Sequence, residues 1–450
     1  MVNDNVVTIL NELDARDKSE INFRHRVYNS GKLGMLMPIN TYAVTPGEVW
    51  NCDATYDIQL SKCVGLVKQD LIAQINYTYV PLYQIWANAD KYIYSDTGAG
   101  ANHPYFTWDL ADNTHALCED QISYYLYPES SAPYSKAISA LELRAYNKIW
   151  YDLFADEYFR TTSSEGNPTS YYVTTDGEDA SINWSLKGMP TNNEYFKKLM
   201  TSITSSEAIA GGTTLQQLRD LIVKERFNIL KKKLGYRMRD LIGKMFGVKP
   251  QPTDSVIPIA THVMTMDKVD VLNTADDQGD IVTRFRKVDF GGNKIQFTSP
   301  WFGIVFVTGS VTPIDIAVTR GLNPQYDNNF VKDAYGYYRP EAQGMAYKNL
   351  KLQHIDATSG MESNIGSASI YDELRAYYSV GKGHYSRPTG WEKEISTLNN
   401  WTSISVQSLN YFDSTVFDPM FVEEQHIKFK LQFGGTIKRQ IKKYIGVGAV

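Results

Sequence analysis

An uninterrupted alternation of apolar and polar residues is the feature that most constrains this chain. It runs from Trp50 to Leu60, and its apolar members are Trp50, Cys52, Ala54, Tyr56, Ile58 and Leu60. Successive side chains of a β-strand point to opposite faces of a sheet, so this spacing puts one apolar row on one face. The pattern predicts a strand over residues 50–60 with one buried face.

Further strand signals lie directly after this one and near the far end of the chain. Residues 71–81 alternate in the same way until Pro81, which cannot donate to a ladder, and residues 427–433 alternate between apolar residues and Lys or Gln. Shorter candidates, bounded by Gly, Pro or Asn, are 304–308, 314–318, 350–354 and 404–406.

The middle of the chain changes to a helical period. Apolar residues recur at helical spacing over 136–160, and a second helical segment starts at Thr213 or Thr214, each followed three residues later by Gln as in a capping box. Strands, then helices, then strands again favour a mainly β domain with a helical insertion over separate domains.

Composition excludes several classes of protein. The chain has 450 residues, of which 43% are apolar and 21% charged, values typical of soluble globular proteins rather than of disordered or coiled-coil chains. Its 45 basic and 50 acidic side chains give a net charge of −5, too balanced for a surface that binds nucleic acid everywhere. Any basic function must therefore be local.

The context in which the chain folds is also indicated by the sequence. Three cysteines without a CxxC pair, Cys52, Cys63 and Cys118, indicate buried or incidental thiols rather than a disulfide framework. The N-terminus lacks the basic and apolar regions of a signal peptide, and no apolar stretch approaches the length of a membrane span. We expect a soluble protein made and used without export, with no contact with a membrane.

Motifs for catalysis are scarce. The seven histidines are dispersed, without HExxH, HxH or zinc-type spacing, and the segment 380–384 departs from the phosphate-loop pattern and predicts a glycine turn. Adjacent acids such as Asp276 and Asp277 are typical of a solvated face. We therefore expect no catalytic residue, no metal ligand and no cofactor, and predict that the protein is not an enzyme.

Two basic stretches are candidate nucleic-acid contacts. Between Gln425 and Val450 the chain has no acid and six basic residues, which are Lys428, Lys430, Lys438, Arg439, Lys442 and Lys443. Between Thr213 and Phe246 it has nine basic residues against three acids. Such cations can neutralise phosphates without reading base sequence. The alternative is that both are solvated faces or protect a strand edge from unwanted pairing.

Several segments, read in order, resemble the major capsid proteins of the Microviridae, small single-stranded DNA bacteriophages. The segments are Gly31 to Ile39 with Pro46-Gly47-Glu48, Tyr79 to Trp86, Leu143 to Trp150 with Phe159-Arg160, Gly235 to Val248, and Tyr337 to Glu341 with Gly344. The third is similar to the family's Phe-Arg-Ala-Tyr-Asn-x-Ile helix. Departures include Glu48 in place of Asp, Met238 in place of Tyr and Asp240 in place of Glu, and the last hundred residues match poorly.

This resemblance implies an eight-stranded antiparallel jelly roll with long helical and loop insertions. Residues 1–30 would be an N-terminal arm, 31–135 the first part of the jelly roll, 136–260 a largely helical insertion, and 261–450 the remaining strands with loops and a basic tail. It also implies self-assembly into a T=1 icosahedral shell around circular single-stranded DNA. The protein would then reside in the virion after assembly in the bacterial cytoplasm, and its partners could include minor capsid, spike, scaffold or DNA-pilot proteins.

Two other functions compete with the capsid hypothesis. A glycan-binding or glycan-cleaving β-sandwich would use the abundant aromatic residues, 31 Tyr and 8 Trp among them, to stack on sugars, but it would need an export signal and a cleft with two carboxylates. A spike or receptor-binding protein would need a stalk or β-repeat, and the sequence has no repeat of fixed period.

Overall fold

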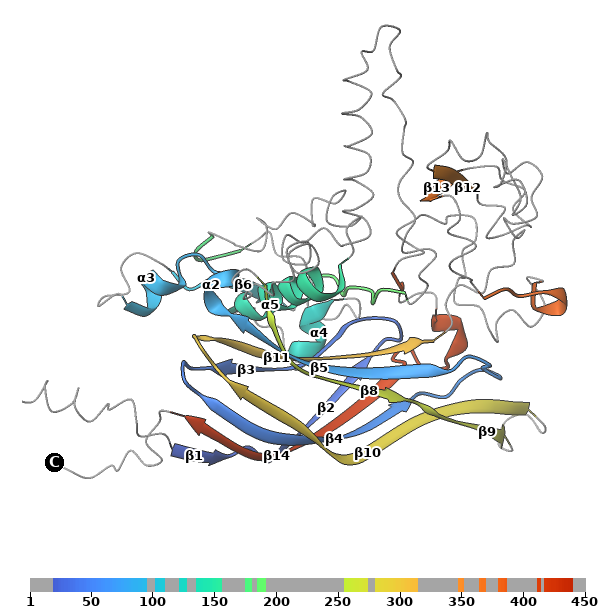
Figure 1. The fold of residues 1–450 in the computed structure, drawn as a ribbon, viewed down its shortest axis with the longest axis horizontal. Coiled ribbons are helices and arrows are strands. Elements are labelled where there is room, and N and C mark those ends of the chain that lie inside the picture. Colours follow the sequence, from blue (N-terminus) through green and yellow to red (C-terminus); the bar gives the residue numbers. More distant parts are fainter. Residues whose placement is uncertain are drawn as a thin grey trace, which may run out of the picture.

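A computed structural model describes thirteen segments of the chain. These are residues 19–94, 102–109, 121–127, 135–155, 175–179, 184–191, 255–273, 280–314, 347–351, 364–369, 379–386, 411–413 and 417–439. The architecture is mainly β, with antiparallel sheets, and two of these sheets form two layers (Figure 1).

Sheet 1 contains six strands from both ends of the described chain. They are β1 (Ser19–Asn22), β2 (His25–Gly31), β4 (Val49–Leu60), β9 (Asp267–Asn273), β10 (Asp280–Thr298) and β14 (Ile427–Arg439). The order is β1-β14-β4-β10-β9, and β2 also pairs with β14. The described part of the segment expected as an N-terminal arm thus contributes β1 and β2 to this sheet.

Sheet 2 contains four strands, β3 (Met37–Val44), β5 (Leu71–Pro81), β8 (Ile257–Thr265) and β11 (Gly303–Pro313), in the order β3-β11-β5-β8. β8 therefore begins inside the range 136–260 that the resemblance assigned to a helical insertion. Two further sheets have two strands each: β6 (Tyr105–Asp109) pairs with β7 (Ser135–Ser139), and β12 (Tyr347–Lys351) pairs with β13 (Asn364–Ser369).

The predicted strands 50–60, 71–81, 304–308 and 427–433 are confirmed as parts of β4, β5, β11 and β14. Of the candidate 350–354, residues 350 and 351 end β12, and the rest lies outside the described residues. Ile314 follows the end of β11, while residues 315–318 and the candidate 404–406 also lie outside them.

The core lies between the two sheets and is rich in aromatic side chains. Trp50, Tyr56 and Tyr77 are at most 1% exposed. Phe23, His25, Tyr42, Trp50 and Phe433 form a cluster whose rings meet at centroid distances of 4.6 to 6.1 Å, mostly edge to face. Such geometry adds to the free energy gained by burial alone. The cluster joins strands from both ends of the chain.

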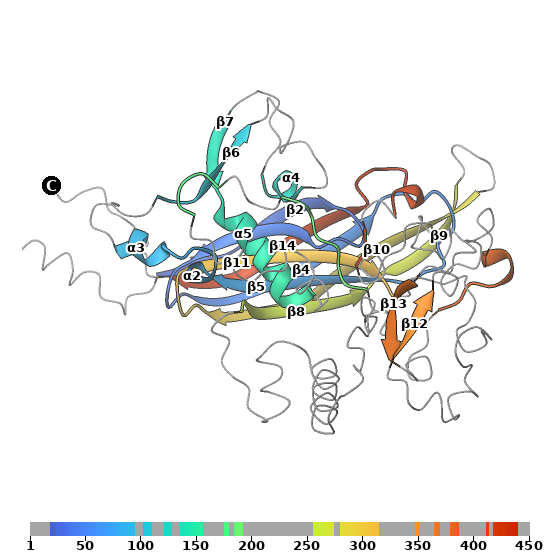
Figure 2. The ribbon, with the colours of Figure 1, turned by 90° about the horizontal axis from the view of Figure 1, so that it is seen from above.

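Helices pack on the outer side of sheet 2 (Figures 1 and 2). They are α2 (Leu82–Ile85), α3 (Ala89–Tyr94), α4 (Ile122–Leu126), α5 (Leu141–Ile149) and the π-helical turn η1 (Trp150–Phe154). The predicted helix over 136–160 is wrong at its start, because residues 135–139 pair with β6 as strand β7. The apolar Ile138 fits either period, and only the partner strand decides between them. Residues 156–160 lie outside the described part.

The outer side of sheet 1 has no cover among the described residues (Figure 1). Along β14 the side chains of Ile427, Phe429 and Leu431 are buried between the sheets, and those of Lys428 and Lys430 point the other way. Within the described residues, sheet 2 is therefore covered on both faces and sheet 1 on one.

A glycine pair bends β14 near its end. Gly435 has φ +88°, a left-handed conformation, and a Cβ there would lie 2.4 Å from the carbonyl oxygen of Asn51. Only glycine fits such a position without displacing the neighbouring strand β4. Downstream of this bend Ile437 is again buried, and Lys438 exposed.

Two of the three cysteines are described. Cys52 and Cys63 are free, buried thiols, as the cysteine pattern predicts, and Cys118 lies outside the described residues. Burial raises the pKa of both thiols to about 12. Both are therefore poor nucleophiles near neutral pH.

His426 fastens the corner between β2 and β3. Its side chain is fully buried, its Nδ1 accepts a hydrogen bond of 3.2 Å from the backbone N–H of Leu33, and its Nε2 lies 3.2 Å from the half-exposed Asp418 carboxylate. Burial, followed by the nearby Lys32 ammonium, lowers the pKa of His426 to about 4. In the native state the ring is therefore neutral at pH 7.

We expect His426 to make the protein less stable in acid. Between pH 6.5 and about 4 the unfolded chain binds a proton on this ring that the folded chain does not, so the contribution is present above pH 6.5 and is lost as the pH falls towards 4. The loss amounts to about 3 kcal/mol.

Urea unfolding of the wild type and of His426→Gln over this pH range measures the effect. The Gln side chain keeps an acceptor for Leu33 and does not titrate. The stability difference between the two proteins should shrink as the pH falls from 6.5 to 4; a constant difference would contradict the assignment.

Candidate nucleic-acid interface

The outer face of sheet 1 carries three of the six basic residues predicted to contact nucleic acid. Lys428 and Lys438 are exposed and Lys430 is partly exposed, and all three lie on the same side of β14. In an antiparallel sheet, residues paired in register share a face. The register of β14 with its neighbours therefore defines the rest of this surface.

Three rows of paired residues cross this surface from β2 to β10. Ser30, Lys428, Gln59 and Arg286 form one row, Tyr28, Lys430, Asp57 and Val288 the next, and Arg26, Gln432 and Thr55 the third. Beyond the bend in β14, two further rows contain Asn22, Thr436, Asn51 and Gln296, and then Glu20, Lys438, Val49 and Thr298. Lys294 pairs with Asp53 between these groups.

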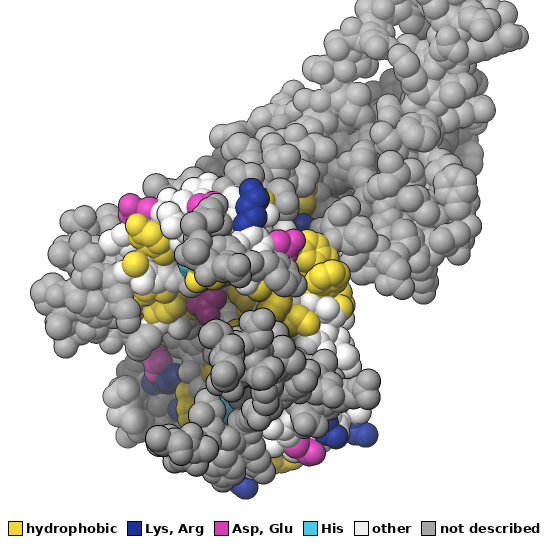
Figure 3. Space-filling view, turned by 90° about the vertical axis from the view of Figure 1, so that its left-hand side faces the viewer, with side chains coloured by type: hydrophobic (Ala, Val, Ile, Leu, Met, Phe, Trp, Pro, Cys, Tyr) yellow, Lys and Arg dark blue, Asp and Glu magenta, His cyan; other side chains and the backbone are white. Residues whose placement is uncertain are grey.

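We call these residues the basic face. It contains six basic side chains, Arg26, Lys428, Lys430, Lys438, Arg286 and Lys294, and three acidic ones, Glu20, Asp53 and Asp57. Amides and hydroxyls occupy most other positions. Figure 3, which views the molecule from the left of Figure 1, shows basic and acidic side chains along the lower edge, on the side of sheet 1.

Several of these cations lie next to carboxylates. Arg286 donates two hydrogen bonds of 3.1 Å to Asp57, Lys428 lies 3.0 Å from Glu423, and Lys438 lies 3.9 Å from Glu20. The hydrogen bonds to Asp57, and then its negative charge, raise the pKa of Arg286 above its ordinary value. Exposed pairs of this kind are weak and are screened by salt, so a polyphosphate can compete for these cations.

Arg439 differs from the three lysines in its contacts within the chain. Its side chain turns inward and donates hydrogen bonds of 2.8 and 2.9 Å to the two oxygens of Glu48 and one of 3.1 Å to the carbonyl of Ala43. The fully buried Glu48 also accepts a hydrogen bond of 2.7 Å from Trp50 Nε1. Arg439 thus ties the end of β14 to the turn between β3 and β4.

The remaining predicted basic residues are not among those that the structure describes. They are Lys442, Lys443 and the whole helical stretch from Thr213 to Phe246. Counting charges along the chain also missed Arg26, Arg286 and Lys294, which β2 and β10 bring beside β14. The alternation of these basic residues with apolar neighbours was the available signal that they lie on the exposed face of a strand.

A depression of about 550 Å³ lies at the end of the basic face near β1. Its lining includes Lys438, Glu20, Asn51, Gln296 and Phe297. Val49 and Trp50 also line it, so the depression has both polar and apolar walls, and its one cation is Lys438 of β14.

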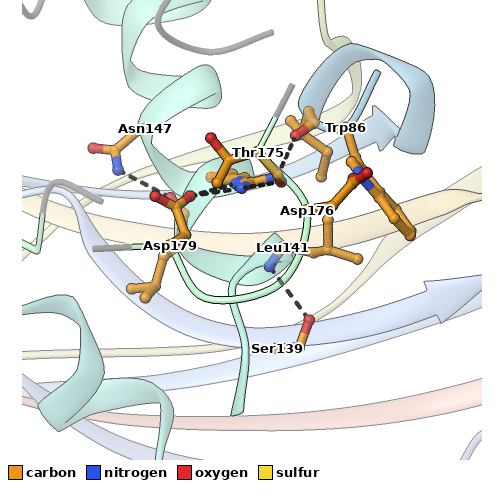
Figure 4. A network of polar contacts seen from close by, with 10 residues as sticks. Trp86, Ser139, Leu141, Asn147, Thr175, Asp176 and Asp179 are labelled. Carbon is orange, nitrogen blue, oxygen red and sulfur yellow. Dashed lines mark hydrogen bonds and ion pairs between the residues drawn. The ribbon is translucent and has the colours of Figure 1, made fainter. Parts of the chain in front are cut away.

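The opposite side of the molecule is fastened by Arg144 on α5. Its guanidinium is 3% exposed and donates to Asp179 Oδ2 from Nη2 at 2.6 Å and from Nε at 3.0 Å, and to the carbonyls of Ile85 and Thr175 (Figure 4). Asp176, in the same short segment, accepts from Trp86 Nε1 at 2.7 Å. One buried cation therefore joins α5, α2 and residues 175–179.

Two aromatic residues of the same helical motif are also anchors. The buried Tyr146 donates to the carbonyl of Leu36 at 2.7 Å and accepts from the N–H of Lys187, and Trp150 Nε1 donates to the carbonyl of Gly188. Burial raises the pKa of Tyr146 above its ordinary value. The residues that carry the resemblance in this segment thus position the helices over sheet 2.

Metal-binding and membrane-spanning features are absent from the part of the chain that the structure describes. There, no group of three or more His, Cys, Asp or Glu side chains is placed to hold a metal ion. Within the same part, no helix has the length and apolar character needed to cross a membrane.

Breaking the Arg144–Asp179 pair should destabilise the fold strongly. We expect Arg144→Met to lower the free energy of unfolding by about 3 to 5 kcal/mol, because it leaves the Asp179 carboxylate buried without its cation. The double variant Arg144→Met/Asp179→Leu should recover part of this loss.

Arg286→Met, which removes an exposed pair, is the matched control and should leave stability nearly unchanged. Chemical denaturation of the four proteins measures the differences. An Arg144→Met variant as stable as the control would contradict the anchoring role.

Comparison with known proteins adds one finding. Residues 14–202 match the family model described as capsid protein (F protein), and no curated protein matches the chain. The matched range contains β1 to β5, the helices over sheet 2 and three of the five resembling segments. The segments at 235–248 and 337–344 lie beyond it.

Proposed function

Residues 14–202 belong to the capsid protein (F protein) family, the major capsid proteins of the Microviridae, and we propose that the whole chain forms a T=1 icosahedral shell around circular single-stranded DNA. The family is structural, so the protein is a virion component. The family match carries this proposal, and the arrangement of the strands supports its finer parts.

The order of the strands supports a jelly roll. Within sheet 1 the strands β2-β14-β4-β10 are neighbours, and sheet 2 has the order β3-β11-β5-β8. Followed along the chain, these eight strands alternate between the sheets except at β5 and β8, which are adjacent in sheet 2. This alternation, with the first and last strands paired, is how an eight-stranded jelly roll closes two Greek keys.

We also propose the division of the chain that the resemblance implies. Residues 31–135 and 261–450 contribute the jelly roll and its loops, residues 136–260 are an insertion, and residues 1–30 are an arm. The pairing of β1 and β2 with β14 suggests that the arm ends before Ser19, and the start of β8 at Ile257 suggests that the insertion ends before that residue.

Assembly needs surfaces for neighbouring subunits. Val269 and Val271 lie on one face of β9 and are 59% and 38% exposed, and Val263 on β8 is 60% exposed. Exposed apolar residues on strands at sheet edges are suited to contacts between copies. Spike, scaffold, minor capsid or DNA-pilot proteins would bind the assembled shell, which forms in the bacterial cytoplasm.

We place the basic face on the inner wall of the shell. Among the described residues, helices cover sheet 2 and none covers the outer face of sheet 1. The six cations of the basic face outnumber its three acids, which favours contact with phosphates over contact with neutral surfaces. DNA would be contacted from the sheet by Lys428, Lys430 and Lys438, and from the tail beyond it by Lys442 and Lys443. Arg439 would contribute indirectly, because its ion pair with Glu48 holds the end of β14 in place.

Electron microscopy of the purified full-length chain, with size-exclusion chromatography, tests the assembly proposal. We expect closed particles of a single diameter, either from the chain expressed alone or after co-expression with the other structural proteins of its virus. A protein that stays monomeric under both conditions and binds glycans on an array would contradict the proposal and favour the sugar-binding sandwich.

Replacing the three lysines of the basic face tests its role. The variant Lys428→Gln/Lys430→Gln/Lys438→Gln should assemble normally and package less DNA. The association constant for single-stranded DNA falls as salt rises. This negative slope of log K against log salt should become less steep, by about 0.7 for each phosphate that is no longer neutralised, or about 2 in total.

Lys91→Gln on α3, away from sheet 1 (Figure 1), is the control and should leave both quantities unchanged. Normal packaging and an unchanged salt slope in the triple variant would show that the basic face does not contact DNA.

A further inference from the structure

Two exposed aromatic side chains interrupt the polar basic face. Tyr28 on β2 is 66% exposed, and Phe290 on β10 is 80% exposed. Burial of apolar side chains is the main favourable contribution to folding, and these two rings gain little from it. Both rings are therefore accessible to a ligand outside the subunit.

Tyr28 lies among cations. It pairs in register with Lys430, and its neighbour on the same face of β2, Arg26, donates a hydrogen bond of 3.1 Å to Gln432. The backbone of β2 is held by its ladder with β14. The ring is thus displayed at a defined position beside two positive charges.

Phe290 is held out by a β-bulge. The register of β10 against β4 shifts between Asp289 and Asn293. Asp289 accepts a hydrogen bond of 2.9 Å from the N–H of Gly291 and one of 3.1 Å from Asn293 Nδ2, which also donates to the carbonyl of Ala54 at 3.2 Å. These contacts fix the bulge from within and fasten it to β4, so Phe290 projects from an ordered support.

The two rings are spaced for one extended ligand. Phe290 follows Asp289, the partner of Tyr56, so it lies beside Thr55, and the row of Thr55 is next to the row of Tyr28. Three strand spacings separate β2 from β10, which puts the rings roughly 15 Å apart across the sheet. A single strand of nucleic acid spans this distance in a few nucleotides.

The surroundings favour nucleic acid over a second subunit. The core of a protein interface is a contiguous apolar patch depleted in charge, whereas the residues between the two rings are Lys430, Asp57, Gln432 and Thr55. Separate aromatic rings on a sheet, with cations beside them, are instead suited to unpaired bases whose phosphates need counter-charge.

We propose that Tyr28 and Phe290 stack against unpaired bases of single-stranded DNA, while Lys430 and Arg26, with Lys428 in the adjoining row, neutralise the neighbouring phosphates. This inference rests on the proposed function and adds to it that the bases, and not only the phosphates, are bound. Stacking tolerates every base, so the contact would be independent of sequence and would prefer single strands over duplex.

Binding of the full-length chain to two labelled strands of equal length tests the proposal. One is oligo(dT), and the other has the same phosphates and sugars with abasic sites in place of bases. Wild-type protein should bind oligo(dT) more tightly than the abasic strand. Tyr28→Leu and Phe290→Leu should each weaken oligo(dT) binding by about fivefold or more, leaving abasic-strand affinity and the salt slope unchanged.

Two controls separate this proposal from the one on which it rests. Tyr92→Leu removes a 42% exposed aromatic residue on α3 and should change neither affinity. The triple lysine variant should weaken binding to both strands. Photocrosslinking of DNA carrying 5-iododeoxyuridine, followed by mass spectrometry, should label Tyr28 and Phe290 and leave Tyr92 unlabelled.

Equal affinity of both leucine variants and the wild type for oligo(dT), with the lysine effect intact, would overturn stacking and leave the phosphate contacts. Disappearance of both effects would overturn the DNA-binding role of the face itself. Leucine variants that bind DNA normally and fail to form particles would assign the two rings to contacts between subunits, which would also overturn the proposal.

Discussion

The packing of sheet 1 against sheet 2 is the interaction on which the rest of the structure depends. Strands β4 and β14 each have a buried apolar row, and these rows face the almost entirely buried strands β5 and β11. Strand β14, the last strand of the described residues, pairs with both β2 and β4, so sheet 1 is continuous only when β14 is in place. The Arg439–Glu48 pair then fastens that strand at its end.

Sheet 2 is covered on both sides, and this asymmetry separates the two faces of the subunit. Helix α5 is held over sheet 2 by hydrogen bonds from Arg144, Tyr146 and Trp150 to three separate segments. The outer face of sheet 1, by contrast, has no cover among the residues that the structure describes. A capsid subunit needs such a division, since its two faces meet different environments.

The motif around Arg144 lies within residues 14–202, the range that matches the capsid protein (F protein) family model. In the structure its residues are anchors: Arg144 holds Asp179, and Tyr146 holds the segment around Leu36. The capsid function proposed above would depend on the surfaces of the subunit, which these anchors help to shape.

How far the sequence could predict this protein depends on how local each feature is. The strands around Tyr56, Tyr77 and Leu431 were predictable, because alternation is a property of neighbouring residues. The start of α5 was not, because Ile138 fits a strand or a helix, and the pairing with β6 decides. The end of β14 was unpredictable for the same reason, since Lys438 and Arg439 are adjacent in sequence and lie on opposite faces of the strand.

The sequence by itself determined the strand periods, the buried row of each strand and the basic character of β14, since these follow from residue type and spacing along the chain. Only the tertiary structure decided that Arg26, Lys430 and Arg286 share one face and that Arg439 does not. The same is true of the exposure of Tyr28 and Phe290 on that face. Pairing between distant strands sets these relationships, and their register depends on packing across the whole sandwich.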